Sequence, residues 1–181
     1  MRITSAVFSL LVSLWVIPSS LSGVHLRKAA EHPAQTNTVF AKVKRDLLGK
    51  TDVPLRLPSF LPYADRGNPI YAIVQSVDRA SYQIELAWTP DCLGGNNCHY
   101  GAVRGSAAPI VEGGGVRKPI LLKGGIKAYF IDFTCGAHCD DAVIDWSESG
   151  YHYSVGMKAG KEATLLKIAN SAIPDRDQQV R

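Results

Sequence analysis

The stretch IYAIVQSVDRASYQIELAW, from Ile70 to Trp88, decides the fold class of this chain. Its two halves, Ile70–Val77 and Ser81–Trp88, have the residue types and the spacing of β-strands. In the second half, apolar and polar residues alternate, which predicts a half-buried strand with one face in water. The three residues between them, Asp78–Ala80, are few enough for a hairpin connection. The stretch therefore predicts two adjacent antiparallel strands.

More strands follow, separated by glycine-rich and polar turns. Gly124 and Gly125 together form a favourable hairpin turn between two of these strands. Strands are expected at His99–Arg104, Lys118–Lys123, Lys127–Phe133, Ala142–Trp146 and Tyr151–Met157, with loops at Gly105–Gly115 and Ser147–Gly150.

Two segments have the apolar spacing of helices instead. Val39–Leu48 predicts a short amphipathic helix, with Thr38 as its N-cap and Gly49 at its end. Lys161–Ile173 predicts a longer helix that stops before Pro174. Each carries one apolar face, which must pack against another element.

Between the first helix and the first strand, Val53–Pro62 is apolar but contains three prolines. Proline lacks the backbone donor of a central strand, so this segment is expected to be extended, packed on the core or at a sheet edge. No crossover helix separates the strands, which disfavours a parallel sheet. The sequence predicts an α+β fold: a twisted antiparallel sheet of about six or seven strands, a short N-terminal helix, and a C-terminal helix packed on one face.

The start of the chain has the three parts of a secretory signal peptide. Arg2 precedes the apolar run Ala6–Ile17, and small residues around Ser22 follow. The run is shorter than the roughly 20 residues of a spanning helix, so cleavage near Ser22 is favoured over retention as an N-terminal anchor. The predicted organisation is a signal peptide at 1–22, a flexible linker at 23–38, one α+β domain at 39–173 and a polar tail at 174–181. We expect an exported protein, periplasmic or extracellular, with no transmembrane span after signal removal.

Composition disfavours nucleic-acid binding. The formal net charge is +4 and is spread along the chain, with one modest cluster at Lys42, Lys44 and Arg45. A nucleic-acid face needs a denser basic surface. The glycines at 113–115 lack the pattern of a phosphate-binding loop. No cofactor and no resident metal are expected.

The four cysteines form two short-range pairs, Cys92 with Cys98 and Cys135 with Cys139. Exported chains oxidise, so two disulfides are expected. Proximity favours local pairing, although a crossed arrangement remains open if the two turns are adjacent. Neither pair has the C-x-x-C spacing typical of redox catalysis. A zinc site that uses cysteines with His99 or His138 is an alternative, but only the second pair has zinc-like spacing.

Three segments carry a resemblance to known proteins: LPSFLP at Leu57–Pro62, DWSESGYHYSVGM at Asp145–Met157, and KIANSAI at Lys167–Ile173. Together they resemble small exported bacterial domains of unknown function, and more widely the lipoprotein-carrier-like and anti-sigma-factor sensor-like domains. This resemblance implies a curved antiparallel sheet that faces a helix, over roughly Pro54–Ile173. The cysteine pairs are not part of that pattern, and no functional residue is transferred.

Every motif in the chain builds a fold and none builds a complete catalytic site, which favours a non-enzyme. Our first hypothesis is a non-catalytic exported domain that binds a partner protein, a lipid-like apolar ligand or the cell envelope; it predicts an apolar groove between sheet and helix. The second is a secreted hydrolase with its acid and base near the second cysteine turn. The third is a structural module without ligand. Trp88 and Trp146 both lie in expected strands, and each has two interpretations, core packing or ligand stacking.

If the two cysteine turns lie side by side, they define one rigid rim of the domain. This candidate functional rim carries His99, His138, Asp140 and Asp141. The hydrolase hypothesis predicts that His138, Asp140, Asp141 or His152 meet in a cleft with shifted pKa values.

Overall fold

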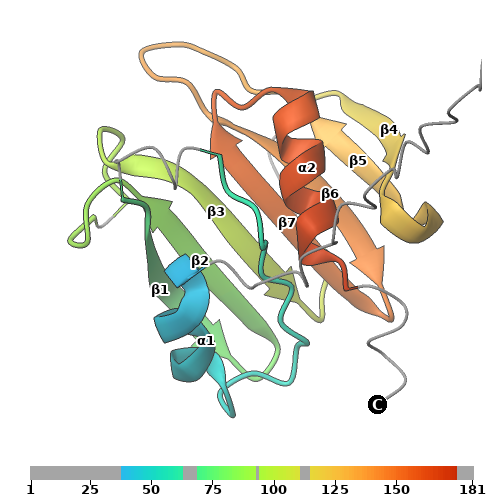
Figure 1. Ribbon diagram of the computed structural model, residues 1–181. Coiled ribbons are helices and arrows are strands. Elements are labelled where there is room, and N and C mark those ends of the chain that lie inside the picture. Colours follow the sequence, from blue (N-terminus) through green and yellow to red (C-terminus); the bar gives the residue numbers. More distant parts are fainter. Residues whose placement is uncertain (1–37, 63–68, 93, 111–114, 175–181) are drawn as a thin grey trace, which may run out of the picture. The chain divides into compact units, whose positions relative to one another are not determined.

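The computed structural model describes residues 38–62, 69–92, 94–110 and 115–174. They form one open, antiparallel, seven-stranded sheet in the order β1-β2-β3-β7-β6-β5-β4 (Figure 1). The strands are β1 (Tyr71–Asp78), β2 (Ser81–Ala87), β3 (His99–Ser106), β4 (Arg117–Leu121), β5 (Lys127–Ile131), β6 (Asp141–Glu148) and β7 (Tyr151–Lys158). The α+β class is confirmed.

Both α-helices lie on the same face of this sheet (Figure 1). Helix α1 (Ala41–Leu47) packs against the edge strand β1, and α2 (Glu162–Ala172) packs against β6 and β7. Their apolar faces join the strands in one hydrophobic core. The first helix begins with a 3-10 turn, Thr38–Phe40, and Thr38 makes no N-cap because Phe40 occupies that position. Gly49 follows α1 with φ +76°, as expected of a helix-terminating glycine.

The segment that contains the three prolines is extended and belongs to no strand. It runs over the helix-bearing face between α1 and α2 (Figure 1), where Val53, Pro58 and Leu61 are buried. The backbone N–H of Arg56 donates to the Tyr82 hydroxyl, and its guanidinium pairs with Glu148 at 2.8 Å. The segment therefore closes the core.

The prediction that one side of β2 faces water is wrong at the C-terminal end of the strand. Glu85 is only 5% exposed and Ala87 is fully buried. Both lie on the sheet face opposite the helices, where we expected water. The reason is that His99 and the cysteine turns cover this end of the sheet.

The predicted loop at Gly105–Gly115 is wrong at its start, because β3 continues to Ser106. Gly105 is buried against the aromatic ring of Tyr82, and a Cβ there would lie 2.4 Å from a ring carbon. The glycine is therefore a strand residue that makes room for a tyrosine. Glycine richness alone does not distinguish this case from a loop.

The predicted signal peptide at 1–22 lies outside the described residues. So do the linker, except Thr38, and the polar tail, except Pro174. No helix within the described ranges is long and apolar enough to cross a bilayer.

Candidate functional site

Both local disulfides are present, which confirms the predicted pairing. Cys92 is bonded to Cys98 and Cys135 to Cys139. Because all four thiols are consumed, none is available as a zinc ligand or a redox nucleophile. No group of three or more metal-ligating side chains within the described part of the chain is arranged to hold a metal ion.

The two disulfide turns line a single cavity of about 460 Å³, which we call the turn cavity. It lies over the sheet face opposite the helices, next to the first disulfide loop, because Glu85, Ile131 and Val143 line it and do not belong to the helix-side core. Of the predicted rim, His99, Asp140 and Asp141 line it, whereas His138 is exposed and does not. The turn residues in its lining are Gly94 and Asn96 from the first turn and Thr134, Cys139 and Asp140 from the second.

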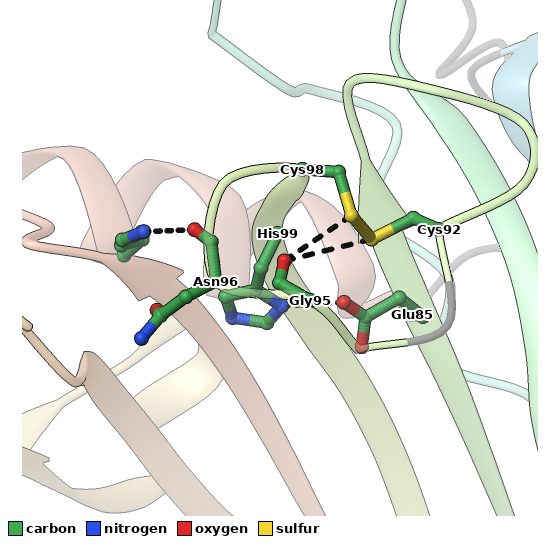
Figure 2. The surroundings of a disulfide bond; sticks show 7 residues. Glu85, Cys92, Gly95, Asn96, Cys98 and His99 are labelled. Atoms are coloured by element: carbon green, nitrogen blue, oxygen red, sulfur yellow. Dashed lines mark hydrogen bonds and ion pairs between the residues drawn. A yellow bond between two sulfur atoms is a disulfide. The ribbon is translucent and has the colours of Figure 1, made fainter.

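His99 is held at both ring nitrogens. Its Nδ1 lies 2.5 Å from the Glu85 carboxylate, and its Nε2 lies 2.8 Å from the Asp141 carboxylate. Figure 2 shows the Glu85 and His99 side chains beneath the loop closed by Cys92 and Cys98. The Gly95 carbonyl oxygen points at this disulfide, 3.2 Å from the Cys98 sulfur. The histidine is thus fixed between two acids from different strands.

The sheet topology explains how residues so far apart in sequence meet. Glu85 comes from β2, His99 from β3 and Asp141 from β6. Strand β7 lies between β3 and β6, and its Gly156, which pairs with Ala102 on β3 and Val143 on β6, lies beside the Asp141 side chain. A Cβ at Gly156 would lie 2.9 Å from an Asp141 carboxylate oxygen. The absence of a side chain there lets Asp141 reach across β7 to His99.

The environment of His99 raises its pKa to about 9. The hydrogen bond to Asp141 is the largest cause; burial acts in the opposite direction, and Glu85 adds to the rise. Near pH 7 the ring is therefore an imidazolium that donates from both nitrogens and has no lone pair to accept a proton. This arrangement neutralises a buried carboxylate and does not supply a general base.

A second cavity, of about 660 Å³, also has His99 and Cys139 in its lining. We call it the aromatic cavity, because Trp88 and Tyr100 meet there edge to face, with ring centroids 4.9 Å apart. Trp88 is half-buried and follows the end of β2. The remaining lining residues are Met157, Lys158, Ala159, Lys161 and Thr164, which lead from the end of β7 into α2.

His152 does not join the other candidate residues. It lies on β7, and its Nδ1 is 2.9 Å from the Ser147 hydroxyl on β6. The two are a directly opposed cross-strand pair. They line a third cavity of about 640 Å³, which does not include His99, Asp140 or Asp141. The hydrolase cluster expected from the sequence is therefore not assembled.

Sequence reasoning missed Glu85 and the cavity-forming role of Lys158 and Lys161. Glu85 occupies a polar position of an alternating strand, which is usually solvated. Glu85 is buried because His99 lies against it. The position of His99 depends on a bulge in the β2–β3 pairing, which the sequence pattern does not reveal. Comparison with protein-family models, curated proteins and solved structures finds no significant match.

Proposed function

We propose that this chain is a non-catalytic exported binding domain whose ligand occupies the aromatic cavity. The observation that carries the proposal is a cavity of about 660 Å³ with an aromatic pair and a methionine in its wall. Ligand sites typically enclose about 300–1,000 Å³ and are lined mainly by apolar and aromatic side chains with a few polar groups. The cavity also adjoins α2, in agreement with the groove between sheet and helix that the first hypothesis requires.

The state of the histidines supports binding over catalysis. A general base must accept a proton at the working pH. His99 is already protonated near pH 7 and is hydrogen-bonded at both nitrogens. His138 is exposed and lies outside both cavities that contain His99.

The hydrolase alternative is favoured by one contact, the Ser147–His152 hydrogen bond of 2.9 Å. A serine and a histidine in contact are two parts of an activated nucleophile. The third part, a group that orients the histidine, is not shown by any contact of His152 among the described residues. We therefore expect Ser147→Ala to leave hydrolysis of p-nitrophenyl acetate at the wild-type rate.

The binding proposal is tested with a neutral fluorescent probe, N-phenyl-1-naphthylamine. We expect saturable binding of one probe per disulfide-intact chain, and a loss of at least about tenfold in affinity for Trp88→Ala. Tyr129→Ala removes an exposed aromatic ring elsewhere and is the matched control; its affinity should equal the wild type.

A second variant protects this test against a folding defect in Trp88→Ala. Thr164 on α2 lines the cavity, so Thr164→Phe should fill it from the helix side and block the probe. Near-ultraviolet circular dichroism reports whether each variant is folded. Wild-type affinity in a folded Thr164→Phe and a folded Trp88→Ala, or no saturable binding at all, would overturn the proposal.

A further inference from the structure

Charge distinguishes the aromatic cavity from the turn cavity. Its lining carries Lys158, Lys161 and His99, and among the residues that the structure describes it includes no acidic side chain. The charge of His99 is offset by its two carboxylate partners, so the lysines determine the local potential. Glu162, the acidic residue in the first turn of α2, pairs with Lys118 at 2.8 Å. The cavity therefore presents positive charge beside aromatic surface.

The two lysines reach the cavity from different elements. The Lys158 ammonium, at the end of β7, donates to the Asn96 carbonyl of the first disulfide loop. An ammonium has three donors, so two remain for a ligand. Lys161 is exposed and is the N-cap residue of α2. Because the N-terminal end of a helix carries partial positive charge, the helix also favours an anion near Lys161.

The apolar wall offers ring and thioether surface. The Tyr100 hydroxyl donates to the Pro62 carbonyl at 3.0 Å, so the fold uses its polar atom; the residue is 3% exposed and belongs to the core that forms the back of the cavity. Trp88 stands perpendicular to that ring, with an interplanar angle of 89°. Met157 adds a flexible, polarisable contact. This surface fits a flat ring or an alkyl chain and has few fixed polar groups that would select a sugar or a peptide.

We infer that the ligand of the aromatic cavity is a free organic acid with an apolar or aromatic body and one anionic group. Its body contacts Trp88, Tyr100 and Met157, and its anion lies between Lys158 and Lys161. This inference rests on the proposed function and specifies the ligand class of the same site. A volume of about 660 Å³ suits such a small amphiphile and not a whole membrane lipid.

The test uses two probes with the same aromatic body. 8-Anilinonaphthalene-1-sulfonate carries one sulfonate, and N-phenyl-1-naphthylamine carries none. At low ionic strength we expect the sulfonate to bind the wild type about tenfold more tightly. Lys158→Gln and Lys161→Gln should each lower the affinity for the sulfonate probe by about threefold and leave the affinity for the neutral probe unchanged. Lys167→Gln, an exposed position of α2 outside the cavity lining, is the matched control.

Two further arms identify the source of the anion. Decanoate should displace the bound sulfonate probe, and decanol, which has the same chain length without the charge, should displace it less effectively. The preference for the anion should shrink as ionic strength rises from about 0.01 M to about 1 M, because salt screens the lysines. Vesicles of phosphatidylglycerol should not displace the probe. Displacement by vesicles and not by decanoate would assign the site to a membrane surface and overturn the inference.

Failure of the inference and failure of the proposed function give different results. One outcome is equal affinity for both probes that the two lysine variants do not change but Trp88→Ala abolishes. It overturns the inference that the ligand is anionic and leaves the proposed binding site in place. Absence of saturable binding for both probes overturns both. Binding of several sulfonate probes per chain, insensitive to Trp88→Ala, also overturns both, because it reports exposed apolar surface and not a cavity.

Discussion

The turn cavity and the aromatic cavity share two wall residues, His99 and Cys139, but have opposite charge. The turn cavity contains four acidic side chains and two basic groups, His99 and Arg104. The aromatic cavity contains His99 and two lysines, without an acidic side chain among the described lining residues. One histidine therefore separates an acidic environment from a basic one. The full list of acids in the turn cavity is Glu85, Asp132, Asp140 and Asp141.

This difference shows why the cluster with the most titratable groups is not the best candidate for function. In the turn cavity, Glu85 and Asp141 are both bonded to His99, and Asp140 accepts a hydrogen bond from the Thr134 hydroxyl at 2.9 Å. The polar groups are largely satisfied by one another. In the aromatic cavity, the half-buried Trp88 ring and the exposed Lys161 side chain line the open volume. Satisfied networks stabilise a fold, whereas binding needs groups that are still available.

The largest effect is expected from removing the charge of the shared histidine. His99→Gln leaves the buried Glu85 carboxylate facing a neutral side chain, and loss of one member of a buried ion pair costs about 3 kcal/mol. Urea unfolding at pH 7 measures this loss. His138→Gln is the control and should stay within about 0.5 kcal/mol of the wild type, because His138 is exposed. Equal stability of the two variants would contradict the structural role assigned to His99.

The second expected effect is a loss of stability in mild alkali. The folded-state pKa of His99, about 9, lies above its ordinary value of 6.5. The folded state therefore binds this proton more tightly than the unfolded state does. The resulting stabilisation is complete below pH 6.5 and disappears as the pH rises to 9, by an amount on the order of 2 kcal/mol.

Urea unfolding between pH 6 and pH 9 measures this dependence. Burial raises the pKa values of Tyr82 and Tyr153 as well, but these groups titrate above that range and do not mask the histidine. The His99→Gln variant should show a flatter dependence than the wild type. An equally steep loss in both proteins would assign the effect to another group.

The sequence is sufficient to predict the disulfides, the strand-rich middle and the C-terminal helix, because local signals specify each of them. Cysteine spacing indicates local pairing, and the apolar stripe that precedes Pro174 defines α2. His99, Asp140 and Asp141 could be nominated because they flank the cysteines. Their common cavity required the two turns to be brought to one end of the sheet.

The remaining features depend on strand order, which local patterns do not encode. The order places β7 between β3 and β6, so that Asp141 meets His99 across Gly156. Glu85 was expected to be exposed to water. The alternation of apolar and polar residues in β2 predicts on which face of the sheet a side chain lies, but it does not predict which other residues cover that face. For the same reason, the sequence left two interpretations of Trp88 open, core packing and ligand stacking. Its position at a cavity depends on α2, which comes more than seventy residues later in the chain.

The two disulfides are expected to differ in their contribution to stability. Cys92→Ser with Cys98→Ser should cost more than Cys135→Ser with Cys139→Ser, because Cys92 is 2% exposed whereas Cys135 is exposed. We expect about 2 kcal/mol for the exposed bridge, from its short loop, and a further loss at the buried one from the new polar group. Urea unfolding of both double variants measures the difference. The reverse order would show that the second turn, and not the first, supports the cavity wall.

The smallest effect is expected from a substitution at Gly156. It tests whether a change in the turn cavity alters ligand binding in the aromatic cavity. In Gly156→Ala the new Cβ would approach the Asp141 carboxylate, which is the mobile end of a side chain, so that group turns aside and the backbone stays in place. We expect a loss of about 1 kcal/mol, and a His99 pKa that falls toward 6.5 because its Asp141 hydrogen bond weakens. Histidine NMR titration measures the pKa directly.

Gly136→Ala is the matched control, since nothing lies within 4 Å of a Cβ at that position. It should change neither stability nor the His99 pKa. In Gly156→Ala the affinity of the aromatic cavity for N-phenyl-1-naphthylamine should remain that of the wild type, because Trp88 and Tyr100 are untouched. A His99 pKa still near 9 in this variant would mean that Glu85 alone holds the proton, and that the reach of Asp141 across β7 contributes little. A fall in pKa together with lost probe binding would instead show that the shared wall couples the two cavities.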